Sequence, residues 1–351
     1  MNQKTMKALV YHAANEISLD DVPVPTIQDP HDVIGRVTVS TICTSDVHIM
    51  KGEIPFVKAP KILGHEFCIE VLEKGDEVKK AEVGKHYMVA PLSFCGQCDN
   101  CKQGRLGRCE NAGGFGIYAE GCQAEYVRIP YADNCMVEIP KGADDEDFLL
   151  LGDMLATAWF GIQNAHVKQG QTVAVVGCGP VGLSACELLT KHFGCQCVAF
   201  DIIPERAQKA VDNGVAISAI NPATDDVEAK VQELTGGKGF PAIIECAGTP
   251  EAFNLAIAIA GYEGMVSTVS VFDGPVTIPM HTLIYKNLRF ATGIQRCEGL
   301  SEMLTELIIG KIEANWILTH HAPLNEIMKG YEVFGNKQDG CTKWVVTPLE
   351  A

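Results

Sequence analysis

The stretch TVAVVGCGPVG, residues 172–182, decides the fold of the second half of this chain. Its first five residues are β-branched or small and predict a buried strand, which leads into the pattern G-x-G-x-x-G. Gly177 allows a tight turn, Gly179 lets a pyrophosphate approach the backbone, and Gly182 lets a helix pack closely on the strand. This context predicts a dinucleotide site, with an ordinary strand–helix turn as the alternative. The loop residues assigned to the site are Gly177, Gly179, Pro180, Val181 and Gly182.

An acidic residue at the end of the next predicted strand indicates which dinucleotide binds. Asp201 closes the strand CVAFD and lies 19 residues beyond Gly182. Its carboxylate can accept hydrogen bonds from ribose hydroxyls and would repel a 2′-phosphate, so the sequence favours NAD over NADP. A helix cap or a surface acid is the alternative role for Asp201. Arg206 follows five residues later and is expected to help hold the ribose, although an arginine there can also bind a phosphate.

The pattern of strands and helices divides the chain in two. Strands and helices alternate from residue 171, ending with a helix over residues 250–260 and a strand over residues 265–272. Such alternation implies βαβ units and a parallel sheet. The first 150 or so residues instead carry short runs rich in Val and Ile between Gly, Pro and Asp, which predict a β-rich domain. The fold class is therefore α/β, with a β-rich domain and a doubly wound domain.

Composition excludes some classes of function. The 351 residues carry a formal net charge of −16, which disfavours binding to a nucleic-acid backbone. Apolar runs near residues 173–189 and 255–271 are interrupted by Gly, Pro or Glu, so no membrane span is predicted. Fifteen cysteines, with an N-terminal segment unlike a secretion signal, favour a reducing cytoplasm.

Four cysteines in the run SFCGQCDNCKQGRLGRC have the spacing C-x2-C-x2-C-x7-C. Two-residue gaps let neighbouring thiolates converge on one tetrahedral ion, and four thiolates fill a zinc shell with no open position. This spacing predicts a structural zinc site; two disulfides or four free thiols are the alternatives. The predicted ligands are Cys95, Cys98, Cys101 and Cys109.

A second set of candidate ligands is spread along the chain. Cys43 begins CTSDVH, His65 lies in ILGHE, and Asp153 lies in LGDMLATAW. A thiolate, an imidazole and a carboxylate can hold zinc and leave one position open for water or substrate. Each residue also has an ordinary explanation. Cys43 could be a small buried apolar residue, His65 a hydrogen-bonded core histidine, and Asp153 a helix cap.

The order of these motifs resembles that of the zinc-dependent medium-chain alcohol dehydrogenases. In both, GHE follows CTSDVH, the four-cysteine segment comes next, and G-x-G-x-x-G lies near residue 180. CTSDVH and GDMLAT are most similar to the bacterial secondary-alcohol dehydrogenase branch, with Asp153 where liver-type enzymes carry a cysteine. The resemblance implies a GroES-like catalytic domain over residues 1–154, a Rossmann domain over 155–292, and a return to the catalytic domain over 293–351.

The resemblance also implies a role for each matched residue at the metal. Cys43, His65 and Asp153 would bind the catalytic zinc. Glu66 would be able to enter the shell when water or substrate leaves. Asp46 would hydrogen-bond the zinc histidine and fix its tautomer. Together with the four-cysteine site, this implies two zinc ions per chain.

Further matched residues would serve the alcohol and the nicotinamide. Ser45 would contact the alcohol oxygen, and His48 would pass the released proton outward. Thr157 would contact the nicotinamide, and backbone groups of Val269 and Val271 would meet its carboxamide.

The resemblance implies a zinc-dependent oxidoreductase that transfers a hydride between NAD(H) and a small alcohol or ketone, with a secondary alcohol expected. A polyol, sugar-alcohol, amino-alcohol or hydroxysteroid dehydrogenase is an alternative on the same scaffold. A nucleotide-binding sensor with a retired site is the alternative from another class. The resemblance also implies a homodimer or homotetramer.

Overall fold

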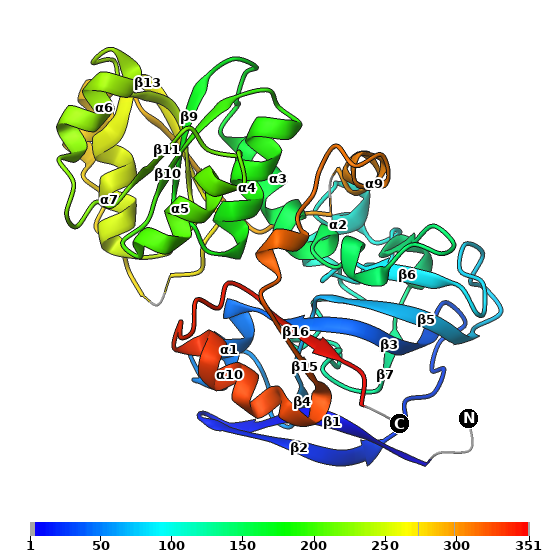
Figure 1. The fold of residues 1–351 in the computed structure, drawn as a ribbon. Coiled ribbons are helices and arrows are strands. Elements are labelled where there is room, and N and C mark those ends of the chain that lie inside the picture. Colours follow the sequence, from blue (N-terminus) through cyan, green and yellow to red (C-terminus); the bar gives the residue numbers. More distant parts are fainter. Residues whose placement is uncertain (1–3, 273, 298, 350–351) are drawn as a thin grey trace. The chain divides into compact units, whose positions relative to one another are not determined.

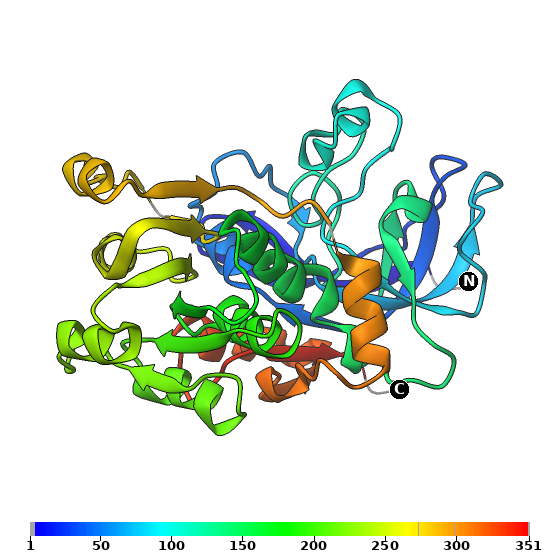
Figure 2. The same ribbon diagram turned by 90° about the horizontal axis from the view of Figure 1, so that it is seen from above.

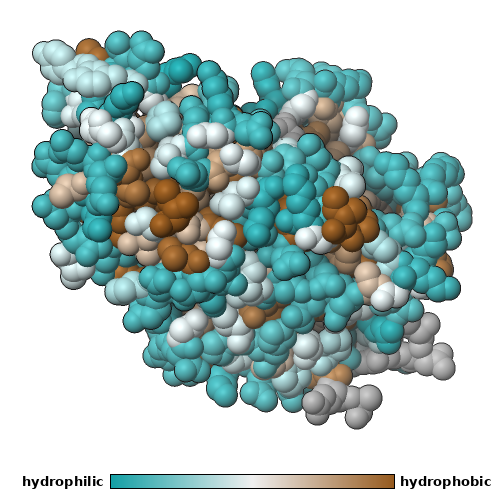
Figure 3. All heavy atoms as spheres, turned by 45° about the horizontal axis from the view of Figure 1, so that its top comes forward, coloured by the Kyte–Doolittle hydropathy of each residue, from teal (hydrophilic) through white to brown (hydrophobic). Residues whose placement is uncertain are grey.

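The computed structural model describes residues 4–272, 274–297 and 299–349. The chain forms two compact units, which Figure 1 shows coloured along the sequence. Unit 1 contains residues 1–153, 299–308 and 318–351, and unit 2 contains residues 154–298 and 309–317. Among the described residues, no helix combines the length and apolar character needed to cross a membrane. Figure 3 shows one face, on which apolar residues form separate clusters within a hydrophilic surface.

Unit 2 is built on a six-stranded sheet in the order β11-β10-β9-β12-β13-β14, with every neighbouring pair parallel. Numbered within the unit, this order is 3-2-1-4-5-6, the arrangement of doubly wound dinucleotide-binding folds. Its strands are β9 (Thr172–Val176), β10 (Gln196–Phe200), β11 (Ser218–Ile220), β12 (Phe240–Glu245), β13 (Ala260–Thr268) and β14 (Arg289–Thr292).

Helices connect these strands and pack on the sheet (Figures 1 and 2). Valines, isoleucines and phenylalanines of β9, β10 and β12 form the buried core beneath them. The doubly wound α/β fold predicted from the sequence is confirmed. The helices of the unit are α3 (Ala156–Asn164), α4 (Pro180–Lys191), α5 (Pro204–Asp212), α6 (Val227–Thr235), α7 (Pro250–Ile259), α8 (Met280–Lys286) and a 3-10 turn at Asn315–Ile317.

Unit 1 contains a three-stranded sheet in the order β2-β1-β4 and a larger sheet in the order β15-β16-β3-β5-β6-β8, with β7 also paired to β3. The larger sheet is rich in Val and Ile, as predicted. The strands are β1 (Thr5–Ala13), β2 (Glu16–Pro23), β3 (Val33–Ile42), β4 (Lys61–Ile62), β5 (Phe67–Lys74), β6 (His86–Val89), β7 (Tyr126–Ile129), β8 (Met136–Glu138), β15 (His320–Pro323) and β16 (Trp344–Thr347).

Short helices join the strands of unit 1. The longer α10 packs its buried face into the cluster that also contains Ile42, Val47 and Trp344, next to the end of β3. The α-helices are α1 (Thr44–Met50), α2 (Asp99–Lys102), α9 (Leu300–Ile308) and α10 (Ile327–Gly335). The 3-10 turns are Leu106–Arg108, Ala132–Asn134, Asp145–Phe148 and Leu324–Glu326.

The central strand β3 positions the main site of unit 1. It ends at Ile42, so that Cys43 stands at the start of α1. On one side it pairs antiparallel with β5, which begins directly after His65 and Glu66. On the other side it pairs with β16, a strand from the far end of the sequence. Residues widely separated in sequence therefore meet at one end of β3.

Candidate active site and metal centres

Four side chains bring potential metal ligands together at the end of β3. One donor atom from each of Cys43, His65, Glu66 and Asp153 lies within 4.8 Å of the others. The Asp153 carboxylate lies 3.8 Å from Cys43 Sγ and 3.4 Å from His65 Nε2. Sulfur, nitrogen and oxygen donors of this kind suit zinc, and three protein ligands are typical of a site that keeps a position open.

Helix α1 holds the first donor in place. Cys43 is the N-cap of this helix, and its backbone N–H donates a 2.9 Å hydrogen bond to the Asp46 carboxylate. An acid three residues into a helix commonly returns such a bond. Ser45, in the first turn, places its hydroxyl 3.3 Å from Cys43 Sγ and 3.2 Å from His65 Nε2. The hydroxyl therefore lies beside the donor cluster.

Asp46 is fully buried and lies on the Nδ1 side of the His65 imidazole. Its Oδ1 lies 3.2 Å from His65 Nδ1, while Nε2 of the same ring lies among the other donors. Burial alone would lower the pKa of His65, but the negative charges of Asp46 and Cys43 raise it well above its usual value. A metal would displace the proton from Nε2, because metal ligation requires the neutral imidazole.

Asp153 lies in the π-helical turn Leu151–Leu155, which precedes α3. The Asp153 carboxylate is therefore inside a widened turn and not at a helix N-cap. Such π turns often occur at functional sites. Burial alone would raise the pKa of Asp153, whereas the hydrogen bond and charge of His65 lower it to about 2. The carboxylate is thus ionised, as a metal ligand must be.

Glu66 differs from the other donors because cationic and hydroxyl partners already occupy one of its oxygens. Oε2 accepts a hydrogen bond from the Thr41 hydroxyl and forms an ion pair with Lys343. Glu66 Oε1 is buried and has no hydrogen-bond partner among the described residues. Burial raises the pKa of Glu66, and the Lys343 charge opposes that rise. One oxygen of Glu66 remains available to a metal.

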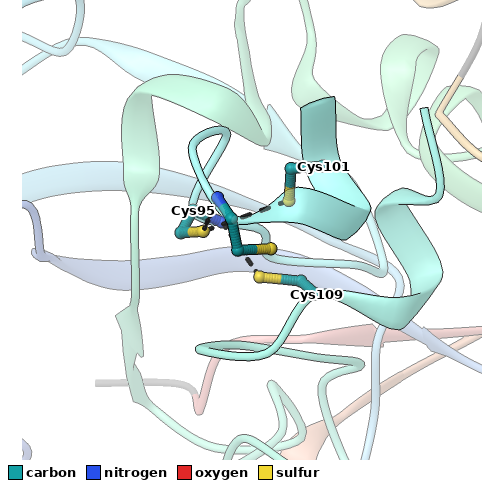
Figure 4. A group of neighbouring side chains, drawn as sticks. Cys95, Cys101 and Cys109 are labelled. Atoms are coloured by element: carbon teal, nitrogen blue, oxygen red, sulfur yellow. Dashed lines mark hydrogen bonds between the residues drawn. The ribbon is translucent and has the colours of Figure 1, made fainter. Parts of the chain in front are cut away.

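The second cluster comprises the four cysteines Cys95, Cys98, Cys101 and Cys109, whose sulfurs lie within 4.8 Å of one another. Figure 4 shows three of them converging from the loop before α2, from α2 itself and from the segment after Leu106–Arg108. None of these four cysteines forms a disulfide, so the two-disulfide alternative is wrong for this structure.

The surroundings of the cysteine cluster shift the pKa values of its thiols in opposite directions. Backbone N–H groups of Cys95 and Asn111 donate to Cys109 Sγ at 3.2 and 3.4 Å, and the Asn111 amide donates to Cys95 Sγ at 3.4 Å. Burial opposes ionisation of Cys95, but hydrogen bonds from Gln97 and Asn111 lower its pKa to about 6. Burial raises the pKa of Cys101 to about 12. A divalent metal would remove this conflict by binding all four as thiolates.

The glycine-rich loop of unit 2 follows β9 and opens α4. Gly177 has φ +92°, and a side chain there would meet Ala247. A Cβ on Gly182 would come within 1.8 Å of the Gly177 carbonyl oxygen. Gly179, the N-cap of α4, has open space where its side chain would be. The loop thus leaves room for a phosphate beside a helix N-terminus.

The Asp201 side chain is hydrogen-bonded to this loop. Its carboxylate accepts hydrogen bonds from the Cys178 N–H at 2.7 Å and from the Ile203 N–H at 2.8 Å. Arg206 lies nearby in α5 and is partly buried. Both predicted ribose-binding side chains therefore lie close to the glycine-rich turn, which Val181 follows in the first turn of α4.

The three residues expected to meet the nicotinamide lie in unit 2. Thr157 is in the first turn of α3. Val269 and Val271 were expected within a strand over residues 265–272, but β13 ends at Thr268 and both lie in the following segment. The Val269 N–H already donates to the Glu245 carbonyl at 3.1 Å. Only its carbonyl oxygen is left for a ligand.

Comparison with known proteins agrees with this arrangement. Residues 29–141 match the model of the alcohol dehydrogenase GroES-like domain, and residues 180–308 match the zinc-binding dehydrogenase model. A zinc-type alcohol dehydrogenase B of Aspergillus flavus is 33% identical over 95% of this chain and 79% of its own length. The chain belongs to the zinc-type alcohol dehydrogenases.

Other alcohol dehydrogenases and related enzymes match along their whole length. The apo structure of zinc-dependent alcohol dehydrogenase 2 from Streptococcus pneumoniae superposes with a TM-score of 0.92, at 32% identity over 99% of each chain. An L-threonine 3-dehydrogenase of Bacillus licheniformis is 31% identical over 98% of this chain and 99% of its own. Relatives of this alcohol dehydrogenase thus differ in the substrates that their names give.

Several further residues support the site without having been predicted from the sequence. Lys343 and Thr41 hold Glu66, and Gln123 donates to Asp46 at 3.2 Å while accepting from the Tyr331 hydroxyl at 2.8 Å. Lys343 could have been noticed as a charge beside the apolar strand WVVT. The others carry no pattern that marks them.

Proposed function

We propose that this chain interconverts a secondary alcohol and its ketone by hydride transfer to and from NAD(H). The observation that carries the proposal is the convergence of Cys43, His65, Glu66 and Asp153 within 4.8 Å, next to the Ser45 hydroxyl. The donor types fit zinc, and a second zinc fits the four-cysteine cluster. The glycine-rich loop with Asp201 supports the choice of NAD.

Bound zinc would supply a Lewis acid that lowers the pKa of an alcohol, and NAD would accept the hydride. Cys43, His65 and Asp153 would hold the metal. The Ser45 hydroxyl lies close enough to the donors to take a proton from an alcohol oxygen there. His48, three positions further along α1, is only 15% exposed and contacts Glu53 through Nδ1 at 2.5 Å. It would pass the proton on toward solvent.

The experiment that tests this proposal is a substrate panel. Purified protein is incubated with secondary alcohols, primary alcohols, polyols, a hydroxysteroid and L-threonine, each with NAD and with NADP. We expect NADH formation to be fastest with a secondary alcohol. If kcat/KM is highest for a polyol, a hydroxysteroid or an amino alcohol, the proposed substrate class is wrong. If no alcohol is turned over, the whole proposal is contradicted.

Cys98→Ser is expected to remove one zinc per chain and to lower thermal stability while sparing chemistry. Four thiolates hold a segment of short helices and loops that has little core of its own, so metal binding contributes directly to its folding. Elemental analysis, a melting curve and kcat below the melting temperature check this. Cys135→Ser, at a buried cysteine outside the cluster, is the control. Unchanged zinc content in Cys98→Ser would contradict the assignment.

His48→Gln is expected to reduce kcat by about 10²-fold or less. General acid–base groups contribute roughly 10²–10⁴-fold, and water can replace a partly exposed relay. The pH dependence of kcat should flatten in the same variant. Glu53→Gln, which changes only the partner of His48, should have a smaller effect on kcat. A normal pH profile in His48→Gln would show that His48 is outside the proton path.

A further inference from the structure

A buried lysine stands behind the candidate metal site. The side chain of Lys343 is 0% exposed, and its ammonium forms an ion pair with Glu66, whose side chain is 1% exposed. Lysine is rarely buried completely unless it is paired. The pair is therefore an integral part of the site, although no local sequence pattern predicts it.

Strand pairing brings this lysine to the site. Strand β16 pairs antiparallel with β3, with Trp344 opposite Ile42 and Val345 opposite Thr41. One step further along this register, Lys343 lies opposite Cys43, the first metal donor. Thr41, on the same strand β3, donates its hydroxyl to the same Glu66 oxygen. The two partners of Glu66 thus come from β3 and from the residue directly before its neighbour β16.

The charges of the donor cluster explain why a cation is needed. A Cys43 thiolate and an Asp153 carboxylate together balance one divalent metal, with His65 neutral. Glu66 adds a third negative charge in a buried place, where an unpaired charge is strongly unfavourable. Lys343 balances that charge without the metal. If Lys343 were absent, the metal would be the remaining cation close to Glu66.

We propose that Lys343 is a positioning residue that holds Glu66 outside the metal shell, so that the fourth coordination position stays open to an alcohol oxygen. The inference rests on the proposed zinc site. Glu66 Oε2 is retained by Lys343 and Thr41, and Oε1 is buried without a hydrogen-bond partner among the described residues. A small movement of Glu66 toward the metal would therefore satisfy Oε1 and close the site.

The test uses the full chain with cobalt(II) in place of zinc and no NAD or alcohol. Cobalt reports its coordination by visible absorption, and imidazole is the probe for an open position. We expect the unmutated protein to bind imidazole with a change in its spectrum. In Lys343→Met we expect a spectrum shifted before any imidazole is added, and imidazole affinity weakened by about tenfold or more.

Rescue separates this role from a merely structural one. In the double variant Lys343→Met with Glu66→Gln, the carboxylate is gone, so imidazole affinity should return to within about threefold of the unmutated value. Lys343→Arg, which keeps the charge, should also stay within about threefold. If Lys343→Met does not fold, Lys343→Gln replaces it with the same expected results.

The outcomes separate the inference from the proposed function. An unmutated protein that binds no cobalt at the mixed-ligand site would overturn both. An unmutated protein that binds cobalt and imidazole, together with a folded Lys343→Met variant of equal imidazole affinity, would overturn only the role of Lys343. Failure of Glu66→Gln to rescue the affinity would overturn it as well.

Discussion

Asp153→Asn is expected to leave a folded chain that lacks the catalytic metal and has lost at least about 10³-fold in kcat. The amide is close in size to the carboxylate, so the π-helical turn Leu151–Leu155 should persist. It carries no charge and is a poor zinc ligand. Without the metal, none of the described groups near Ser45 could act as a comparable Lewis acid. A metal ion in that role stabilises the transition state by several kcal/mol. A factor of 10³ corresponds to about 4 kcal/mol.

The measurement combines zinc content, a melting curve and kcat on the same preparation. Asp147→Asn, an exposed acid six positions earlier, is the matched control and should keep full metal content and activity. Full metal content with near-normal kcat in Asp153→Asn would show that Asp153 is not a ligand. Glu66 would then be the candidate for the third ligand, because one of its oxygens lies in the same donor cluster.

Asp201→Gly is expected to have the second large effect, on the choice of cofactor. In the unmutated protein, kcat/KM with NAD should exceed that with NADP by at least about tenfold, roughly 1.4 kcal/mol, because the carboxylate repels a 2′-phosphate. The glycine variant loses both the repulsion and the ribose acceptor. Its kcat/KM should therefore fall with NAD and rise with NADP.

Asp201→Asn separates charge from support of the loop. The Asp201 carboxylate accepts the Cys178 N–H, and an asparagine oxygen can accept the same bond without a charge. We therefore expect the asparagine variant to keep the stability that the glycine variant loses, and to gain activity with NADP. Melting curves and kcat/KM with both cofactors decide this. Equal kcat/KM for NAD and NADP in the unmutated protein would contradict the preference itself.

The parts of the structure that could be predicted are those in which local sequence carries the information. The strand–glycine–helix unit at residues 172–191 follows from residue types that are adjacent in sequence, and β9 covers the five residues predicted for it. The four-cysteine set could be named because its spacing is characteristic, and the mixed set because the order of its motifs resembles that of a known family. The alternation of strands and helices from residue 171 likewise indicated the parallel sheet.

The missing parts depend on contacts between distant segments. Lys343 reaches Glu66 only through the pairing of β16 with β3. Tyr331 supports Asp46 through Gln123, a chain of contacts that no local pattern reveals. The strand predicted over residues 265–272 in fact runs from Ala260 to Thr268. The predicted end was too late because the apolar pattern continues beyond Thr268, the last residue that pairs with β14.

The position of β16 in the sequence has a consequence for biosynthesis. All the metal donors of the mixed site lie within the first 153 residues, whereas Lys343 is made about 190 residues later. At about 5–20 residues per second, the ribosome would need on the order of ten to forty seconds to add that length. During this interval a nascent chain would offer zinc all four donors, Glu66 included. When β16 then pairs with β3, Lys343 would draw Glu66 away from the metal. The metal would thus bind with four protein ligands first and gain its open coordination position later.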